Sequence, residues 1–462
     1  MSMQKGEQKM KIENDLGRDD VRLLVMRIAI PSMLAQFVSV LYSVVDRMYI
    51  GNIPEIGETA LAGVGVCGPI VTLITAFGSL VGVGGAPLMS IRLGEKDEKG
   101  ASQILANCFL LLSAISLIIM AAALLLKNRL LVWFGASEAI FPYANDYITI
   151  YLLGTIFALL SIGMNQFIIC QGFAKVAMKS VMLGAVVNIV LDPVFIFGFD
   201  MGVKGGALAT VISQMASAAF VLAFLFGKRV PIRITFGNYQ WRIMRKVIFL
   251  GLSPFLIVAF DNVLVIAMNA SLQHYGGPEG DMLLTCNTIV QSFMLMVTMP
   301  LGGITGGTQS ILGYNFGARR SDRVLAAQQW IVTLALIFTA VMFIIAQAVP
   351  QYFVRIFTRE PEYVELTVWA IRVFTLGIIP LSIQYGIVDG YTGMGIAPIA
   401  ISLSAFRKTL YLLGVFLIPM IFGVRAVFYT EPFSDFLGTA VSIAVYLLTM
   451  KKILRRRENG AL

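Results

Sequence analysis

The sequence contains few charged residues. Only 13% of its 462 residues are charged, while 58% are hydrophobic, and the mean hydropathy is +0.82. Ordinary soluble domains carry about 25% charged residues, so this chain lacks the polar surface that would keep a protein of its size dissolved. The composition predicts an all-α polytopic membrane protein.

Histidine and cysteine are scarce as well. His274 is the one histidine, which excludes multi-histidine metal sites, including the HExxH zinc motif. The four cysteines lie in different apolar segments without a CxxC pair, so we expect small buried hydrophobes rather than a disulfide framework or a metal site. The sequence also lacks DDxxD-type clusters and catalytic Ser/His sets, so we expect no cofactor and no enzyme activity.

The net charge of +9 does not indicate nucleic-acid binding. The basic residues lie in short loops and at the chain ends, as membrane topology predicts, and not on a helix face with interleaved aromatics. The first twenty residues have no apolar core and do not resemble a cleavable signal peptide. We expect residues 1–22 to form a mobile cytoplasmic tail.

About twelve apolar segments are long enough to span a bilayer, which takes roughly 20 residues. They lie near 23–50, 60–88, 102–127, 139–172, 177–199, 204–227, 246–272, 283–312, 324–349, 364–391, 395–421 and 428–450. Basic residues concentrate in the loops after the even-numbered segments and at the C-terminus. The positive-inside rule then predicts that both termini lie in the cytoplasm. We expect a multi-pass protein of a bacterial-type cytoplasmic membrane.

The two halves of the chain look like repeats. Three landmark pairs share one offset in residue number (254 − 31, 307 − 84 and 317 − 94): Pro31 with Pro254, Gly84 with Gly307, and Gly94 with Gly317. Two later pairs, Gln166 with Gln384 and Gln171 with Asp389, share a slightly smaller offset (384 − 166 and 389 − 171). This duplication predicts two six-helix bundles related by a pseudo-two-fold axis along the membrane normal. We expect a lobe at 23–228, an inter-lobe loop at 229–245, a second lobe at 246–450 and a basic tail at 451–462.

Polar residues inside apolar segments are costly and point to function. In the first half, Asp46 lies in segment one, and Asn188 and Asp192 are four residues apart on one face of segment five. Pro193 removes a backbone hydrogen bond and leaves the carbonyl of Ile189 without its usual donor. Thr210 in segment six adds another oxygen. This set suits a hard cation.

Two carboxylates in one low-dielectric pocket cannot both ionise cheaply, so such a pair takes up a proton or a sodium ion readily. We therefore expect Asp46, Asn188, Asp192 and Thr210 to form a cation-coupling site. Each residue alone has a simpler interpretation: an interfacial ion pair with Arg47, a helix-packing amide, or the start of a loop.

The second half lacks this carboxylate pair, because Asn269 stands where the larger offset would place the counterpart of Asp46. The remaining intramembrane polar residues are expected to line a substrate cavity without coupling an ion: Gln36, Asp261, Asn262, Gln291, Gln384 and Asp389.

Four stretches resemble the MATE (multidrug and toxic compound extrusion) transporters, and within them the DinF/MepA-like branch more than the NorM branch. They are "VVDRMYIG", "ALAGVGVCGPI", "NIVLDPVFIFGF…GVKGGALATVIS" and "GGTQSILGYNFGARRSDRV". The resemblance implies antiport of amphipathic, often cationic drugs against H⁺ or Na⁺. It also implies an N-lobe ion site at Asp46, Asn188, Asp192 and Thr210. Asp261 lies seven residues after Pro254, whereas the NorM branch has its acidic residue some eight positions after the equivalent proline. Asp389 stands where DinF-like members tend to have a neutral residue.

Two alternatives remain at this stage. A lipid-linked saccharide flippase of the same superfamily would need a strongly cationic cavity, whereas the intramembrane charges look mostly acidic. A polytopic membrane enzyme or a channel would need a catalytic set or a pore-lining repeat, and neither pattern is present. The expected partners are small-molecule drugs and the lipid bilayer, and a monomer with two internal lobes suffices.

Overall fold

The computed structural model describes residues 14–228 and 230–460, and within these ranges the regular structure is helical throughout. The first half of the chain forms seven α-helices: α1 (Val21–Gly51), α2 (Gly57–Gly94), α3 (Glu98–Trp133), α4 (Phe141–Leu153), α5 (Thr155–Ile169), α6 (Ala174–Pro193) and α7 (Val203–Phe226). A wide π-helical turn, Val194–Gly198, follows Pro193 at the end of α6.

The second half repeats this layout with more interruptions. Its helices are α8 (Trp241–Gly276), α9 (Gly280–Gly307), α10 (Gln309–Gly317), α11 (Ser321–Ala348), α12 (Pro350–Val354), α13 (Pro361–Phe374), α14 (Ile378–Gly393), α15 (Ala397–Phe422) and α16 (Thr430–Glu458). Short 3₁₀ turns at Gly277–Glu279, Thr375–Gly377 and Val424–Tyr429 join neighbouring helices.

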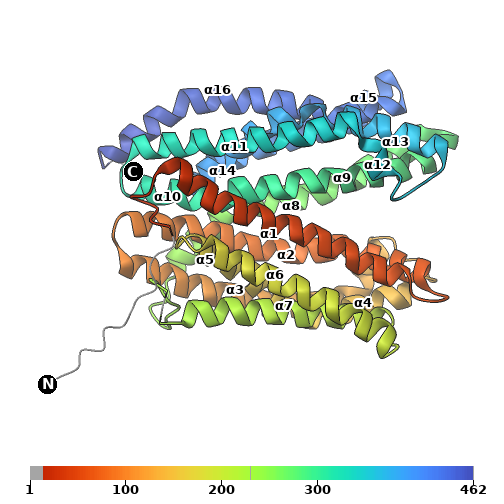
Figure 1. Cartoon of the computed structure of the whole chain (residues 1–462), viewed down its shortest axis with the longest axis horizontal. Coiled ribbons are helices and arrows are strands. Elements are labelled where there is room, and N and C mark those ends of the chain that lie inside the picture. The colour runs from red at the N-terminus through yellow and green to blue at the C-terminus, as the bar shows by residue number, and fades with distance from the viewer. Residues whose placement is uncertain (1–13, 229, 461–462) are drawn as a thin grey trace.

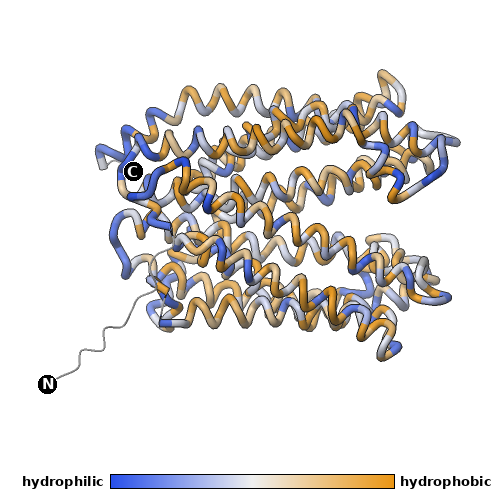
Figure 2. Tube along the Cα trace, viewed as in Figure 1, coloured by the Kyte–Doolittle hydropathy of each residue, from blue (hydrophilic) through white to orange (hydrophobic). Residues whose placement is uncertain are grey.

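Eleven helical stretches are long and apolar enough to cross a membrane, and the bent pair α4 and α5 makes a twelfth. These two helices meet at 56° around Gly154, so the expected segment at 139–172 is one broken span. The span count thus agrees with the twelve segments that the sequence predicts. The apolar residues form a continuous band across the middle of the bundle, with polar residues gathered at its two ends (Figure 2).

The helices form two bundles lying side by side, α2 to α7 in one and α9 to α16 in the other (Figure 1). Helices α1 and α8 join the bundles in equivalent ways: α1 packs on α6 of its own lobe and on α9 of the other, and α8 packs on α15 and on α2. We call the end where α1 begins and α16 ends the basic end, and the other end the distal end.

Glycines bring the two lobes into close contact near the basic end. A Cβ atom on Gly94 would overlap the carbonyl oxygen of Tyr314, and one on Gly317 would overlap that of Ile91. These are equivalent contacts on the two sides of the pseudo-two-fold axis. Further along, Gly251 lies against the backbone of Leu80. Close inter-lobe packing of this kind needs residues without side chains.

Turns at equivalent positions of the two halves have the same backbone conformation. Lys96 and Arg319 are related by the larger offset (319 − 96), and both adopt positive φ, at 62° and 58°. Gly172 and Gly395 are related in the same way (395 − 172) and adopt φ of 89° and 76°. The smaller offset expected for the later segments is therefore wrong, because the turn that follows Gln171 keeps the larger one.

The N-terminal segment 14–20 packs against both lobes, which corrects the expected mobile tail for this part of the chain. The Asn14 amide donates to the carbonyl of Gly172 (2.8 Å), and Arg323 donates to the carbonyls of Leu16 and Asp19. Residues 1–13 of that expected tail, and residue 229 of the expected loop, lie outside the described residues. Helix α8 begins inside the expected inter-lobe loop, and α16 continues through the basic residues of the expected tail.

Candidate ion and substrate sites

The N-lobe brings its two intramembrane acids together. Asp46 from α1 and Asp192 from α6 are 8% and 0% exposed, and the two acidic side chains lie close enough to interact. Two ionised carboxylates at this distance repel each other, so a proton or another cation at the pair would stabilise it. Asp192 is in place because α6 ends at Pro193 and the chain turns there into a wide helical turn.

Asn188 and Thr210 lie beside the acid pair. The Asn188 Nδ2 atom is 3.3 Å from Asp192 Oδ1 and 3.5 Å from Thr210 Oγ1, and the Thr210 hydroxyl donates to the carbonyl of Gly206 (3.0 Å). Tyr147 of α4, which the sequence did not single out, is buried beside Asp46 and Thr210. All four residues expected at the coupling site therefore lie together.

Three buried oxygens at this site have no hydrogen-bond donor: Asp46 Oδ1, Asn188 Oδ1 and Asp192 Oδ2. Among the described residues, no Lys or Arg forms a salt bridge with either acid. The neighbouring Arg47 is exposed. Unpaired carboxylate and amide oxygens in a buried position suit a proton or a hard cation such as Na⁺.

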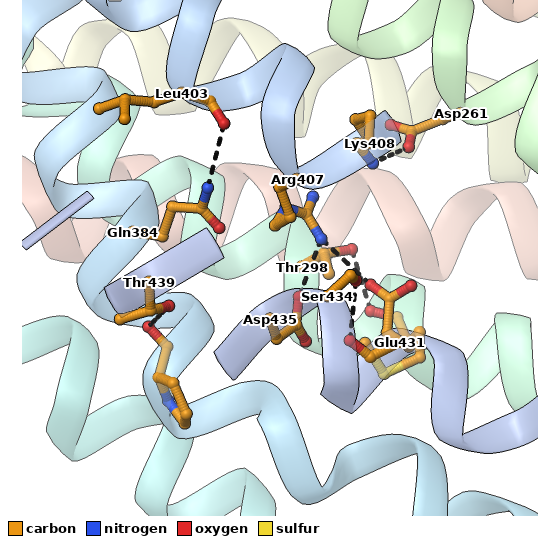
Figure 3. Close-up of polar contacts among 12 residues, drawn as sticks. Asp261, Thr298, Gln384, Leu403, Arg407, Lys408, Glu431, Ser434, Asp435 and Thr439 are labelled. Atoms are coloured by element: carbon orange, nitrogen blue, oxygen red, sulfur yellow. Dashed lines mark hydrogen bonds and ion pairs between the residues drawn. The ribbon is translucent and has the colours of Figure 1, made fainter. Parts of the chain in front are cut away.

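The C-lobe carries buried charges that the sequence analysis missed. Arg407 of α15 is 5% exposed and binds Asp435 of α16, which is 0% exposed, at 2.9 Å, and Glu431 at 3.3 Å (Figure 3). The next residue, Lys408, pairs with Asp261 of α8. The available signal was two basic residues in the middle of the apolar segment at 395–421, which is as costly as an intramembrane acid.

Asp389 of α14 has neutral partners. It accepts hydrogen bonds from the Thr305 hydroxyl and from the Gln309 amide (3.0 Å). Asp389 and Gln384 both line a cavity of about 60 Å³ inside the C-lobe, which is also lined by Arg407 and Lys408.

The other residues expected at the substrate cavity are more scattered. Asn262 donates to Val258 of its own helix (3.0 Å). Gln36 on α1 and Gln291 on α9 are half-buried, and neither lines the C-lobe cavity. The structure therefore brings Asp261, Gln384 and Asp389 close to one cavity and leaves the remaining three outside it.

The described helices agree in fold with solved transporters. The structure titled "Outward-facing conformation of a multidrug resistance MATE family transporter of the MOP superfamily" superposes with a TM-score of 0.88, at 21% identity, over 95% of this chain and 98% of that one. At this identity the likeness shows the fold alone. The predicted all-α fold of two bundles is confirmed.

Curated relatives match over most of their length. The multidrug export protein MepA of Staphylococcus aureus (strain MSSA476) is 22% identical over 433 residues, 92% of this chain and 93% of the relative. MepA of Staphylococcus haemolyticus (strain JCSC1435) is 24% identical over 414 residues, 88% and 89% of the two chains. The MatE family model matches residues 31–194 and 255–420. These two ranges are most of both lobes, so the chain belongs to the MatE family of transporters, as the sequence motifs predict.

Proposed function

We propose that this protein is a secondary active multidrug efflux transporter. It exports amphipathic, often cationic organic compounds by antiport with H⁺ or Na⁺ through alternating access of the two lobes. Membership of the MatE family and the similarity to MepA multidrug export proteins support the substrate class. The observation that carries the coupling is the buried Asp46–Asp192 pair, which has no fixed cation among the described residues.

The acid pair couples drug export to ion flow, because it binds a cation when the site is closed and releases it when the site opens. When the site is closed, as here, contact between the two carboxyls is stable only with a proton or Na⁺ bound. When α1 moves away from α6, each carboxyl gains access to water and the cation leaves. Because α1 also packs on α9 of the other lobe, loading and unloading of this site change the contact between the lobes. Asn188 and Thr210 supply oxygens that orient the cation.

We place the basic end in the cytoplasm, in a bacterial cytoplasmic membrane, by the positive-inside rule. The close contacts at Gly94 and Gly317 and the packed segment 14–20 then lie on the cytoplasmic side, which corresponds to an outward-facing state. The protein acts as a monomer in the bilayer, since each chain contains both lobes. Transport driven by an ion gradient needs no catalytic activity.

The flippase alternative has less support. It requires a cationic cavity that holds pyrophosphate, whereas Arg407 is bound by two carboxylates and Lys408 by one. With Asp389 in the lining as well, carboxylates outnumber cations around the C-lobe cavity, so it is not the strongly cationic cavity that a flippase needs.

The direct test uses inside-out membrane vesicles that contain the protein. We expect ethidium to accumulate in the vesicles when a pH gradient or a Na⁺ gradient of the right direction is imposed, and to leak out when an ionophore collapses that gradient. The gradient that works identifies the coupling ion. Ethidium movement that is the same with and without both gradients would contradict the proposal.

A further inference from the structure

The C-lobe cavity is lined by side chains of both charges. The lining residues are Ile257, Gln384, Tyr385, Val388, Asp389, Ser404, Arg407 and Lys408. Its volume of about 60 Å³ exceeds the roughly 10–15 Å³ that one water molecule needs. The cavity therefore has room for the charged end of a substrate, and the rest of a drug-sized compound would lie outside it.

The two cations of this cavity differ in how firmly they are held. Arg407 binds two carboxylates, and the nearer of these, Asp435, is completely buried. Lys408 binds one carboxylate, Asp261 (Figure 3). The Lys408 side chain is 9% exposed, but that of Asp261 is 50% exposed. A buried ammonium is thus paired with a carboxylate that already contacts the surroundings of the protein.

Because Lys408 is buried and Asp261 is half exposed, Asp261 can be exchanged for another anion while Lys408 stays in place. A buried ammonium without a counterion is strongly unfavourable, so Lys408 requires an anion at all times. Half of the Asp261 side chain is not enclosed by protein, so it can turn away from Lys408 without a rearrangement of the surrounding helices. Another carboxylate can therefore take its place on Lys408. Arg407 offers no such exchange, because one of its two partners is buried.

Asp389 provides the opposite charge in the same cavity. Its partners Thr305 and Gln309 are both neutral, and no Lys or Arg in the described part of the chain forms a salt bridge with it. A cationic group that enters the cavity gains a charge-assisted contact there. Gln384, also in the lining, has a buried Oε1 atom without a donor and adds an acceptor for an N–H group.

We propose that Lys408 is an anion-binding subsite of the substrate pocket, at which a substrate carboxylate replaces Asp261 while Asp389 receives the substrate's ammonium group. The preferred substrates are zwitterionic amphiphiles that carry one carboxylate and one cationic nitrogen. This inference rests on the proposed export function and narrows its substrate class. A plain organic cation leaves Asp261 on Lys408 and uses Asp389 alone.

A matched pair of dyes tests this preference. Rhodamine 110 carries a free carboxylate beside its cationic ring system, and rhodamine 123 is its methyl ester, so the two differ in the anionic group alone. Their dissociation constants are measured by fluorescence polarisation on purified protein at neutral pH. The readout is the selectivity ratio, Kd of rhodamine 123 divided by Kd of rhodamine 110.

We expect Lys408→Met to lower the selectivity ratio by about tenfold or more, because the charged contact to the carboxylate is lost. Lys408→Arg should retain the ratio within about threefold, because the positive charge remains. Asp261→Asn should raise the ratio, since it removes the competing carboxylate. The double variant Lys408→Met/Asp261→Asn removes the pair as a unit, so it keeps the test valid if Lys408→Met alone does not fold.

The exposed distal pair Arg425–Glu279 provides the control. Arg425→Met should leave the ratio at the wild-type value. An unchanged ratio in Lys408→Met or the double variant, or a lowered ratio in Asp261→Asn, would overturn the inference. Gradient-driven transport of rhodamine 123 by the wild type separates the two proposals. If transport occurs without the ratio change, only the subsite is wrong, and if transport is absent the proposed function is wrong as well.

Discussion

Equivalent helices of the two lobes differ in charge: α6 of the N-lobe has a glycine where α15 of the C-lobe has a buried arginine. Gly184 on α6 and Arg407 on α15 are equivalent positions, related by the same offset (407 − 184) as Gly94 and Gly317. At Gly184, α6 lies so close to α7 that a Cβ would overlap the Ser217 hydroxyl. In the C-lobe the small residue is on the partner helix, where Gly438 leaves room for the Arg407 side chain.

The two lobes also differ in how their buried acids are neutralised. The C-lobe acids have their cations built into the chain, at Arg407 and Lys408. The N-lobe acids, Asp46 and Asp192, have none within salt-bridge distance in the described ranges, and under the proposed function they take a cation from solution. A duplicated fold can therefore keep one lobe as an exchangeable ion site and use the other for fixed charges around a cavity.

The largest expected effect comes from removing the fixed cation. Arg407→Met leaves Asp435 buried without a partner, and breaking a buried ion pair in this way costs about 3–5 kcal/mol. We expect a marked fall in the thermal unfolding midpoint of the purified protein. The matched change Arg425→Met breaks an exposed pair and should cost about 1 kcal/mol or less. Equal midpoints for the two variants would show that the Arg407 cluster does not stabilise the C-lobe.

The same substitution in the two lobes should have different consequences for stability. Asp435→Asn weakens a charged hydrogen bond to Arg407 and should cost about 1.5–3 kcal/mol. Asp192→Asn relieves the contact between two acids, so the unfolding midpoint should stay constant or rise. Thermal unfolding of both variants at neutral pH measures the contrast. A loss of stability in Asp192→Asn as large as that in Asp435→Asn would contradict the difference between the lobes.

The glycine contacts between the lobes should behave alike, because they are related by the pseudo-two-fold axis. Gly94→Leu and Gly317→Leu both overpack this interface, which typically costs about 1–3 kcal/mol. We expect both to separate the lobes at the basic end, seen as longer distances between spin labels on the two lobes. Gly65→Leu, at a helix position with open space around it, is the control. A longer distance in only one of the two variants would contradict the equivalence of the two glycine contacts.

The four residues expected at the N-lobe site could be picked out from the sequence because each stands out as a polar residue in an apolar segment. Asn188 and Asp192 share a helix face through their four-residue spacing, and Asp46 stands out in an apolar segment. Tyr147 was missed because a tyrosine in an apolar helix gives no such signal, and its place at the site depends on how α4 packs.

The C-lobe charges were harder to interpret from the sequence. Arg407 pairs with two acids of the next helix, Glu431 and Asp435, and Lys408 pairs with Asp261 on a helix much earlier in the chain. These pairings depend on the packing of α8, α15 and α16. The packed segment 14–20 was missed for the same reason, because its polar composition matches that of a free tail while its partners lie on both lobes.

The most direct test of the account separates ion coupling from drug binding at the N-lobe pair. Proteoliposomes with wild type, Asp46→Asn or Asp192→Asn are compared for ethidium accumulation under an ion gradient and for ethidium exchange without one. Asp146→Asn, in an exposed ion pair with Lys204, is the matched control. We predict that both N-lobe variants lose gradient-driven accumulation and keep the exchange, while the control keeps both. Normal gradient-driven accumulation in Asp46→Asn and Asp192→Asn would contradict the claim that this acid pair carries the coupling ion.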